Sequence, residues 1–581
     1  MSKLNVDQKN IRDLFQSKKA DFLIPDYQRP YAWTEEECQT LWNDLFSFAF
    51  PDNDCSKFDR NDEYFLGPIV TFKNENNKLE VIDGQQRLTT LMLLLRAFYV
   101  KFIHMNDDDS ISTRQNIEQC LWKTNEFGKP DTSSLKINSE VATDSDKDEF
   151  LYILRNGCTQ NKNKKSNYAE NYIFFQKKIE EFISHFPSYF AYFPTRILNN
   201  CILLPIEAES QDTALTIFST LNDRGKPLSD ADIFKAQFYK YYTEIGKKKE
   251  FIDQWKELEE LCENTFRPTS GTPMDELFTR YMYFERAKLG IKSSTTEALR
   301  KFYEKDDYKL LKSKETFNNL ITLARFWNDI SNQNPDRFSD KILQCLFILN
   351  YAPNNMWTYI VSVYFMQNKD DNELLNDDDF FVFLTKITCF IFAYSITNTG
   401  VNALRTPVFA EMVNIVNNIP VSFKEYKFDK LKLSSLLYNF NFTNLRPITR
   451  SMLTWWIFQN KDQTIPSLKT SFEIEHIYAR NRQKIEHGLT NAEYLESLGN
   501  KSLLEKSINI RASDYRFFDK KNYYLGKLST RNTQRRETEV QELIHIANIK
   551  TDFSEKDIIE RNKNIIESFI EFLNKNNLIM Q

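Results

Sequence analysis

The sequence predicts a predominantly helical α+β protein. Apolar residues recur at helical spacing over most of the 581 residues, and two short strand-like segments precede a polar turn and a long apolar helix. Hydrophobic residues make up 41% and charged residues 27%, with a mean hydropathy of −0.54, which is typical of a soluble globular protein with several cores. This length corresponds to about three or four domains.

The composition excludes a disordered chain, a fibre and a protein with several membrane spans. The most apolar stretch, 380–396, carries Lys386 at its middle and falls short of the ~18 uninterrupted apolar residues of a membrane span. It therefore predicts a buried core helix. The N-terminus reads MSKLNVDQKN and lacks the apolar segment of a secretory signal. We expect a cytoplasmic protein without membrane contact.

The cysteines and the charge narrow the class of protein further. Eight cysteines lie far apart and none forms a C-x-x-C pair, which argues against a disulfide framework or a zinc ribbon and favours reduced thiols. The net charge is −5 and the isoelectric point is near 5.9, whereas a constitutive nucleic-acid-binding domain is normally basic. Contact with DNA would therefore use local patches or a regulated surface.

Short patterns predict the elements of the N-terminal part in order. Residues 34–37 form a capping box and start a helix. Residues 64–72 and 79–82 predict two strands joined by a polar turn. After Arg87, apolar residues at helical spacing predict a helix that presents one face to a core. The unit is strand, glycine-containing turn and helix.

The remaining chain alternates polar and amphipathic segments. Residues 106–168 are rich in Asp, Asn, Ser and Lys, which predicts a surface insertion, and 199–209 predict a strand. Residues 230–440 show mostly amphipathic helix patterns, interrupted by the acidic run 368–379, which predicts an exposed and poorly ordered loop. Residues 440–581 form a last unit.

The turn 83–87 (DGQQR) is the first candidate site, although the chain contains no P-loop motif. The helix that follows offers unpaired N–H groups and a positive dipole end, and Gly84 allows close approach of the backbone. Arg87 could bind phosphate oxygens, Asp83 could hold Mg²⁺, and Gln85 or Gln86 could orient a water. The alternative is a polar turn in which the arginine pairs with the aspartate.

Three further segments accompany this turn. They are 24–33 (IPDYQRPYAW), 65–70 (FLGPIV) and 218–229 (FSTLNDRGKPLS), and with 81–91 (VIDGQQRLTTL) they occur in the order found in one family. On these motifs, residues 8–240 resemble the N-terminal domain of the GmrSD family of modification-dependent restriction enzymes. That domain is similar to ParB and sulfiredoxin, in which a comparable turn binds nucleotide.

The resemblance implies a module that binds and hydrolyses a nucleoside triphosphate. GTP, ATP, UTP and CTP all remain open as its substrate. For the aromatic residues Tyr27 and Trp33, packing in the core is the alternative role. The residues implied in nucleotide binding are Asp83, Gly84, Gln85, Gln86 and Arg87 of the turn, Tyr27, Gln28 and Arg29, and Asn222, Arg224 and Gly225.

The C-terminal part carries a second constellation. It consists of 472–477 (FEIEHI), 498–504 (LGNKSLL), Asn509 and 517–521 (FFDKK). The arrangement fits an HNH, or ββα-metal, nuclease, which needs a neutral imidazole to deprotonate a water and one Mg²⁺ held by hard ligands. A single histidine at a strand end is also commonly a hydrogen-bonded structural residue.

Within this constellation each residue has an expected role. His476 is the candidate base, and Asn500 is the candidate residue that orients the loop carrying it. Glu475 and Asn509 are candidate metal ligands. Adjacent strand residues point to opposite faces, so Glu475 and His476 can share a site only where the strand ends. Lys520 could stabilise charge on the phosphate, with Lys521 as the other candidate.

The same segments resemble the C-terminal HNH domain of the GmrSD family over residues 440–581. The family often continues the E-H-I motif with a proline and a glutamine, and here 478–480 (YAR) replace them, which puts the shape of the loop in question. Residues 501–550 contain eleven Lys and Arg against six Asp and Glu, which favours contact with DNA. No paired cysteines are available for structural zinc.

The sequence thus predicts three parts: a ParB/sulfiredoxin-like domain at 1–240 with a helical insertion near 106–195, a helical middle at 241–439, and an HNH domain at 440–581. The expected function is NTP-dependent, Mg²⁺- or Mn²⁺-dependent nicking or cutting of double-stranded DNA in restriction of modified phage DNA, with a homodimer as an option. Two alternatives stay open. One is a non-cutting NTP switch that recruits a partner, and the other is a sulfiredoxin-type phosphotransferase.

Overall fold

The structure is a computed structural model of the chain and describes residues 5–580 except 7, 142–143, 161–164, 211–212, 215–216, 218–228, 399, 401 and 528–534. The chain folds into two compact units, Met1–Lys256 and Glu257–Gln581. It is a predominantly helical α+β protein with a mixed sheet, as the sequence predicts. The boundary predicted at 440 falls inside the second unit, where the C-terminal helix packs on helices of the middle part.

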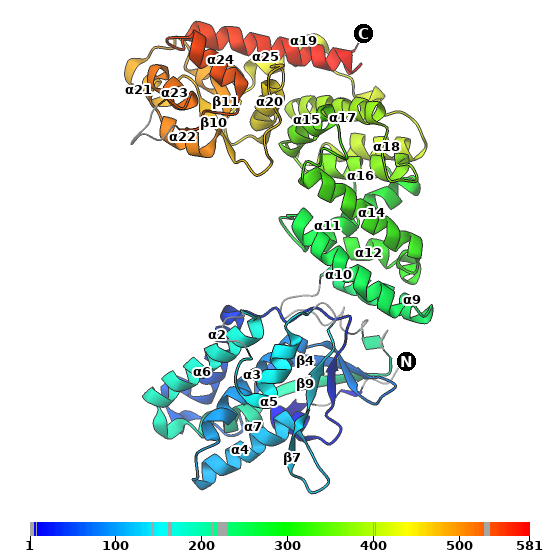
Figure 1. Cartoon of the computed structure of the whole chain (residues 1–581), viewed down its shortest axis with the longest axis vertical. Coiled ribbons are helices and arrows are strands. Elements are labelled where there is room, and N and C mark those ends of the chain that lie inside the picture. The colour runs from blue at the N-terminus through cyan, green and yellow to red at the C-terminus, as the bar shows by residue number, and fades with distance from the viewer. Residues whose placement is uncertain are drawn as a thin grey trace. The chain divides into compact units, whose positions relative to one another are not determined.

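The first unit combines a sheet with a set of helices (Figure 1). Its strands are β1 (Asn5–Val6), β2 (Lys9–Asn10), β3 (Phe22–Ile24), β4 (Tyr64–Lys73), β5 (Leu79–Asp83), β6 (Trp122–Thr124), β7 (Pro130–Leu135), β8 (Ile137–Ser139) and β9 (Cys201–Ala208). Its helices are α1 (Ile11–Gln16), α2 (Glu35–Ala49), α3 (Gln85–Phe102), α4 (Asp108–Leu121), α5 (Lys147–Asn156), α6 (Asn167–His185), α7 (Tyr192–Asn200), α9 (Asp230–Glu244) and the start of α10 (Lys248–Thr265). Short 3₁₀ turns are η1 (Pro51–Asn53), η2 (Cys55–Lys57) and η3 (Pro187–Tyr189).

The described strands of this unit form a seven-stranded mixed sheet in the order β1-β9-β4-β5-β3-β8, with β2 also paired to β9. The pairs β4–β9, β3–β5 and β3–β8 are parallel, whereas β4–β5 is an antiparallel hairpin. The remaining strands β6 and β7 pair separately. Strand β5 lies in the interior of the sheet, and the turn after it leads directly into α3.

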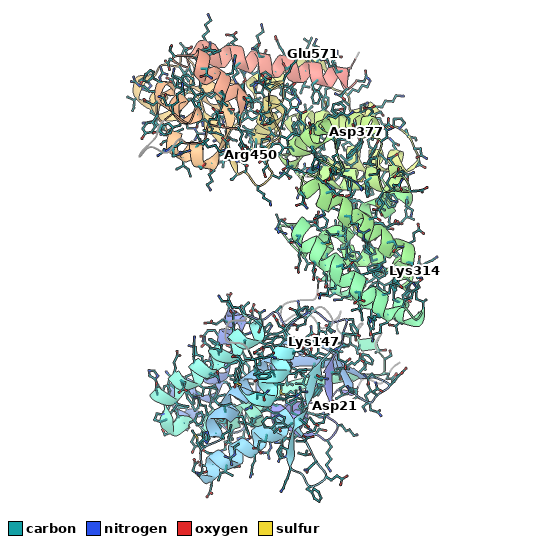
Figure 2. The ribbon with its side chains drawn as sticks, in the orientation of Figure 1. Asp21, Lys147, Lys314, Asp377, Arg450 and Glu571 are labelled. Carbon is teal, nitrogen blue, oxygen red and sulfur yellow. The ribbon has the colours of Figure 1, made fainter. Side chains whose placement is uncertain are left out.

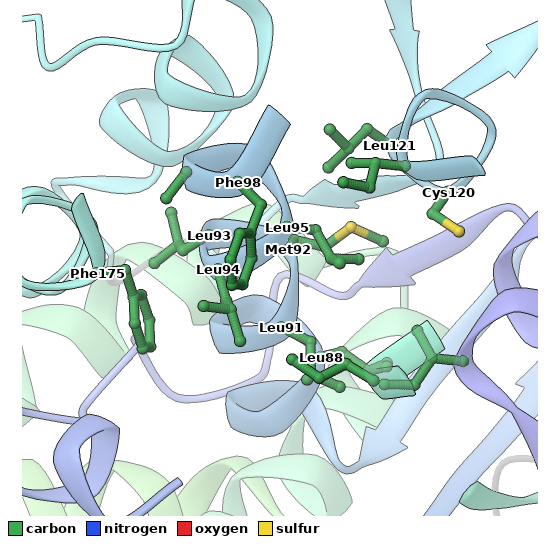
Figure 3. Packing of buried hydrophobic residues seen from close by; sticks show 14 of the residues in the cluster. Leu88, Leu91, Met92, Leu93, Leu94, Leu95, Phe98, Cys120, Leu121 and Phe175 are labelled. Atoms are coloured by element: carbon green, nitrogen blue, oxygen red, sulfur yellow. The ribbon is translucent and has the colours of Figure 1, made fainter. Parts of the chain in front are cut away.

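Local patterns in this unit are confirmed. The strands predicted at 64–72 and 79–82 are β4 and β5, the strand predicted at 199–209 is β9, and the capping box at Thr34 starts α2. Helix α3 forms the centre of the core. Figure 3 shows its apolar side chains, Leu94 and Phe98 among them, between Phe175 on one side and Leu121 on the other.

The prediction of a surface insertion at 106–168 is wrong. Strand β8 is an edge strand of the main sheet, and Ile137 within it is fully buried. Helix α4 packs against α3 and buries Ile117 and Leu121. The segment is polar in composition because its outer faces are solvated, while a few apolar residues complete the core. The helical insertion predicted near 106–195 does contain α4 to α7, together with β6, β7 and β8.

The second unit is a stack of helices followed by a smaller α+β part. Its helices are the end of α10, α11 (Pro273–Lys288), α12 (Leu299–Tyr303), α13 (Lys305–Tyr308), α14 (Lys314–Ser331), α15 (Asp340–Asn350), α16 (Met356–Asn368), α17 (Asp377–Thr397), α18 (Arg405–Val416), α19 (Lys430–Asn439), α20 (Pro447–Ile457), α21 (Arg480–Glu486), α22 (Lys506–Ala512), α23 (Phe517–Tyr524), α24 (Gln541–Ile549) and α25 (Glu555–Lys575). Its strands are β10 (Phe472–His476) and β11 (Lys501–Glu505), and its 3₁₀ turns are η4 (Lys309–Leu311), η5 (Lys424–Tyr426), η6 (Ala492–Glu496) and η7 (Leu498–Asn500). Side chains fill the space between the ribbons of these helices (Figure 2).

Helix α17 contains the apolar stretch that the sequence places in a core. Among the described helices, α17 is the one whose length and apolar composition would allow it to cross a membrane. However, 61% of its most apolar window is buried inside the fold. Phe383, Phe390 and Cys389 are among its buried residues, and α15, α19 and α20 pack on it. A core helix passes the same test of length and apolarity, so the finding agrees with the prediction.

The acidic run 368–379 is more ordered than predicted. Its last residues form the first turn of α17, where Asp377 and Asp378 pair with Lys341. The carboxylate of Glu373 accepts a hydrogen bond from Thr322 at 2.6 Å, and its carbonyl accepts one from Arg337. Acidic residues at a helix N-terminus interact favourably with its dipole, which explains the acidic composition without disorder.

Candidate functional site

The C-terminal part contains a β-hairpin followed by a helix. Strands β10 and β11 pair antiparallel with His476 opposite Lys501, and α22 begins directly after β11. His476 is the last residue of β10, as the sequence predicts, and Asn500 immediately precedes β11. The hairpin therefore brings the two residues to the same end, although many residues separate them in the chain.

The side chain of Asn500 fixes the backbone just after the histidine. Its Oδ1 accepts a hydrogen bond from the Tyr478 N–H at 2.7 Å, and its Nδ2 donates to the Tyr478 carbonyl at 3.1 Å and to the Leu495 carbonyl at 3.3 Å. Its own carbonyl accepts from the Ile477 N–H at 2.9 Å. Asn500 is fully buried, so no water competes for these groups. This is the contact pattern expected of a residue that orients the histidine loop.

His476 is only 7% exposed, and its Nε2 lies 3.5 Å from Glu496 Oε1, which is longer than a good hydrogen bond. Burial lowers the pKa of His476 below its usual range, and the nearby cations Lys501 and Arg480 act in the same direction, while Glu496 opposes them. The imidazole is therefore neutral near pH 7. A neutral imidazole is the form that can accept a proton.

Glu496 of η6 connects the histidine to a buried lysine. Lys501 is fully buried, and its Nζ donates to Glu496, to Asn444 Oδ1 at 2.9 Å and to the Phe442 carbonyl. Burial would raise the pKa of Glu496, but its contacts with His476 and Lys501 outweigh burial and hold that pKa well below its usual range. Glu496 is thus a stable anion beside the imidazole.

The carboxylate of Glu475 faces different partners from those of its neighbour His476. Its Oε1 accepts hydrogen bonds from Lys520 Nζ at 2.7 Å and from Tyr524 OH at 2.5 Å, both on α23. Lys520 Nζ also donates to the His476 carbonyl at 2.7 Å. Burial raises the pKa of Glu475, with Lys520 and Tyr524 opposing it. Lys520 is therefore placed to brace the strand end from inside the fold.

Asn509 lies on α22, which packs against β10. Its Nδ2 donates to Glu473 Oε2 at 2.9 Å. Glu473 and Glu475 are two residues apart on one strand and so share a face, which places Asn509 on the Glu475 side of the hairpin. No group of three or more His, Cys, Asp or Glu that could hold a metal occurs in the described part of the chain. Lys521 instead donates to the Lys550 carbonyl at 3.1 Å.

The last helix holds the turn before β11 from outside. Arg561 of α25 donates through Nη1 to the carbonyls of Leu498 at 2.8 Å, Gly499 at 3.1 Å and Lys501 at 2.7 Å. Its other nitrogens bind Glu542 at 2.7 Å. A Cβ at Gly499 would stand 2.0 Å from the Ile558 carbonyl, so only glycine lets α25 approach this closely.

The turn after β5 stands at the N-terminus of α3. Asp83 ends β5, Gly84 has a φ of +89° and caps α3, and a Cβ at Gly84 would stand 3.1 Å from Ile69. Asp83 Oδ1 accepts from the Gly84 N–H at 2.7 Å. The buried Oε1 of Gln85 has no hydrogen-bond partner among the described residues. Buried polar atoms without a hydrogen-bond partner are rare in folded proteins.

The charges of two arginines act on Asp83. Burial raises the pKa of Asp83, and the Gly84 N–H, Arg87 and Arg29 oppose that shift. Arg87 Nη1 donates to the Pro68 carbonyl at 3.1 Å, and a Cβ at Gly67 would stand 3.0 Å from its guanidinium. The 65–70 segment thus packs against Arg87, which explains why it accompanies the turn.

Other residues implied in nucleotide binding brace the turn. Gln28 Nε2 donates to the Val81 and Ile82 carbonyls at 3.4 and 3.2 Å. Gln86 Oε1 accepts from the Ala32 N–H at 2.7 Å, and its Nε2 donates to the Pro30 carbonyl at 3.1 Å. These side chains hold β5 and the preceding loop, so they position the turn.

The aromatic residues of the first motif lie in the interior. Tyr27 is buried against Tyr239 with ring centroids 4.8 Å apart, and its hydroxyl donates to Glu80 at 3.3 Å. Trp33 packs against the core of the first unit. Core packing, which the sequence leaves open for both, is what their contacts support. Asn222, Arg224 and Gly225 lie outside the described residues.

Comparison with protein families covers both parts of the chain. Residues 11–239 match the model of the GmrSD restriction endonuclease N-terminal domain, and residues 424–568 match the model of the GmrSD restriction endonuclease C-terminal domain. The chain belongs to the GmrSD restriction endonuclease family. The 83–87 turn lies in the region that matches the N-terminal model, and the hairpin with His476 lies in the region that matches the C-terminal model.

One curated relative adds little to the GmrSD assignment. The uncharacterized protein MJ0686 of Methanocaldococcus jannaschii is 22% identical over 264 residues. The matched region is 41% of this chain and 43% of the relative, so less than half of either protein is compared.

The sequence did not point to three residues that surround His476 and Asn500. Glu496, Lys501 and Arg561 form the buried ion pairs and backbone contacts around His476 and Asn500. Lys501 directly follows Asn500 and is the first residue of the segment that forms β11. It is fully buried there. A lysine in a segment expected to be buried is unusual, so the sequence could have indicated a special role for it. Arg561 stands on an amphipathic helix and gives no such signal.

Proposed function

We propose that this chain is a DNA endonuclease of the restriction type, with an HNH centre at the end of the β10–β11 hairpin. The observation that carries the proposal is a neutral, buried histidine at the end of β10, whose following backbone is held on both its N–H and its carbonyl by Asn500. Family membership of both domains supports a nuclease. A histidine fixed in this way is prepared for proton transfer with little reorganisation.

In this mechanism His476 accepts a proton from a water molecule as the water attacks phosphorus. The P–O bond to the leaving oxygen breaks, and that oxygen takes a proton from solvent. Glu496, 3.5 Å from Nε2, stabilises the imidazolium that forms and does not itself take the proton, because its pKa is held low. Removing such a base typically costs ~10²–10⁴-fold in rate.

In this proposal Glu475 and Asn509 would be the protein ligands of one hard cation such as Mg²⁺ or Mn²⁺. Glu475 uses only Oε1 for Lys520 and Tyr524, and Asn509 uses only Nδ2 for Glu473, so one oxygen of each makes no hydrogen bond to a described residue. Magnesium commonly takes one or two protein oxygens and completes its shell with water and phosphate. When bound, the cation would stabilise negative charge on the phosphate.

Lys520 has a supporting role in this proposal. The sequence makes it a candidate for contact with the phosphate, but its Nζ is committed to Glu475 and to the His476 carbonyl and is 1% exposed. It therefore positions the strand end and neutralises Glu475. Exposed cations that could contact the DNA backbone include Lys506 and Arg516, which form surface ion pairs with Glu473 and Glu486.

The N-terminal domain is proposed to bind and hydrolyse a nucleoside triphosphate at the 83–87 turn. Arg87 and Arg29 supply positive charge, the N-terminus of α3 supplies N–H groups, and Asp83 is the carboxylate that could hold Mg²⁺. The unpartnered Gln85 Oε1 supports a polar ligand there. We further propose that the substrate is modified phage DNA in the cytoplasm. The chain could act there as a homodimer.

One experiment tests the nuclease directly. Supercoiled plasmid is incubated with Mg²⁺ or Mn²⁺ and either the parent chain, His476→Ala or His545→Ala. His545 is exposed on α24 and serves as the matched control. We expect nicking by the parent and by His545→Ala and none by His476→Ala. Nicking by His476→Ala at the parent rate would refute the HNH centre, and NTP hydrolysis without nicking by the parent would favour a non-cutting switch.

A further inference from the structure

A cavity in the helical stack of the second unit has the features of a binding site. Its volume is about 450 Å³, within the range of ligand pockets. It is lined by α11, α14, α15 and α16, together with residues 265–270 and Leu468. None of these residues belongs to the hairpin with His476. The cavity therefore has no role in the proposed cleavage chemistry.

Arg280 of α11 is the central feature of this cavity. The residue is more than nine-tenths buried, and its Nε donates to Glu276 at 2.9 Å. Its guanidinium carbon lies 4.0 Å from the ring centroid of Trp327 and 4.6 Å from that of Phe266, so the planar group is held between two aromatic faces. Stacking of this kind fixes the direction in which the guanidinium nitrogens point.

Both terminal nitrogens of Arg280 lack a hydrogen-bond partner in the part of the chain that the structure describes. Nη1 is buried without any acceptor, and the single hydrogen bond of the side chain uses Nε. Leaving a buried donor unpaired typically costs ~1–3 kcal/mol, and more for a charged group. A rigid, desolvated guanidinium with free donors is suited to a ligand that presents two adjacent acceptors.

The other lining groups restrict the ligand further. Trp357 meets Trp327 edge to face at 5.5 Å and adds flat apolar surface, while Glu276 supplies an acceptor beside Arg280. The amides of Asn350 and Asn355 lie at the exposed ends of two helices. Arg267 brings a further positive charge to the same lining. Flat surface, a donor fork beside an acceptor, and a cation together match a nucleotide.

We propose that this cavity binds a single nucleotide unit, with its base against Arg280 and Glu276 and its phosphate at Arg267. Guanine is the best match among the bases, because N7 and O6 are the acceptor pair that arginine binds bidentately, and its N–H groups face an acceptor such as Glu276. The nucleotide comes either free from solution or everted from a DNA strand. The first source is independent of the proposed nuclease, and the second rests on it.

The test uses the full chain carrying Arg87→Ala, so that the 83–87 turn does not contribute binding. Guanosine 5′-monophosphate and cytidine 5′-monophosphate are titrated by calorimetry. A DNA duplex containing a fluorescent guanine analogue reports eversion as a rise in emission. Arg280→Met removes the donor fork, and Arg325→Met, an exposed arginine on α14, is the matched control.

We expect guanosine monophosphate to bind more tightly than cytidine monophosphate, or the analogue to brighten, and Arg280→Met to weaken that effect ~10–100-fold while Arg325→Met leaves it unchanged. If Arg280→Met fails to fold, Asn355→Ala is used, with an expected weakening of roughly two- to tenfold. Absence of both effects in the parent, or equal effects in Arg280→Met and the parent, would overturn the site. Failure of plasmid nicking alone would leave the calorimetric result standing.

Discussion

The side chain of Asn500 forms hydrogen bonds with both backbone groups of Tyr478, accepting from its N–H at 2.7 Å and donating to its carbonyl at 3.1 Å. This two-point contact sets the direction of the chain just beyond His476. An amide can do this because it carries a donor and an acceptor side by side. An aspartate or a leucine of similar size would satisfy one group or neither.

Asn500→Ala is therefore expected to lose DNA nicking and to lower the free energy of unfolding by ~1–3 kcal/mol, since the Tyr478 and Leu495 backbone groups become unpaired. Urea unfolding and plasmid nicking measure the two effects. Extra Mn²⁺ should give no rescue, because Asn500 binds backbone only. Asn548→Ala on the exposed side of α24 is the control. A folded Asn500→Ala protein with parental nicking would contradict the assigned role.

Asn509→Ala should also lose nicking, but with partial recovery at high Mn²⁺ concentration, because mass action refills a weakened cation site. Titration of Mn²⁺ in the nicking assay measures this recovery. Glu473→Gln is the discriminating variant, since it changes the residue that Asn509 contacts while leaving Asn509 in place. Equal loss in both variants without recovery at any Mn²⁺ concentration would show that Asn509 acts only through Glu473.

Glu496 is expected to make the free energy of unfolding depend on pH. Its pKa in the folded chain is lowered from the ordinary value of 4.5, so its stabilising effect is fully present above that pH and is lost as the pH falls through the lower folded value. The difference in free energy of unfolding between the parent and Glu496→Gln should be on the order of 1–3 kcal/mol at pH 7 and shrink below pH 4.5. Urea unfolding at several pH values tests this. The exposed Glu493→Gln is the control, and a difference that does not change with pH would disprove the linkage.

Asp83→Ala and Arg87→Ala should each abolish NTP hydrolysis while leaving the first unit folded. The expected loss is large because a charged contact to phosphate in a buried site is not replaced by water at equal strength. Phosphate release measures activity, and circular dichroism measures folding. Arg155→Ala, an exposed arginine of α5, controls for loss of positive charge. Parental rates of phosphate release in both variants would exclude the turn as the hydrolytic site.

Local features of this chain could be predicted from its sequence because short-range physics determines them. The capping box at Thr34, the strand that ends at Asp83 and the turn at Gly84 each depend on a few neighbouring residues. The contacts of Lys520 could not be predicted in this way. A lysine near a proposed nuclease centre suggests a phosphate contact, but its actual partners lie more than forty residues away, at Glu475 and His476.

Composition was also a poor guide where a polar segment contains a few buried residues. The segment around Ile137 is mostly hydrophilic, yet it adds a strand to the main sheet, because one fully buried apolar residue and a row of backbone hydrogen bonds suffice at an edge. Arg561 illustrates the same limit at longer range. Its three carbonyl partners lie about sixty residues earlier in the chain, and no local pattern links them.

The hydrogen bonds from Arg561 to the turn before β11 have a consequence for the synthesis of the chain. The hairpin with His476 is translated well before α25, and the carbonyls of Leu498, Gly499 and Lys501 remain without this partner until the helix leaves the ribosome. At ~5–20 residues per second, the ~50 residues that separate the turn from α25 take several seconds to add. Until α25 has been synthesised, a nascent chain therefore holds the turn that carries Asn500 without its contacts to Arg561.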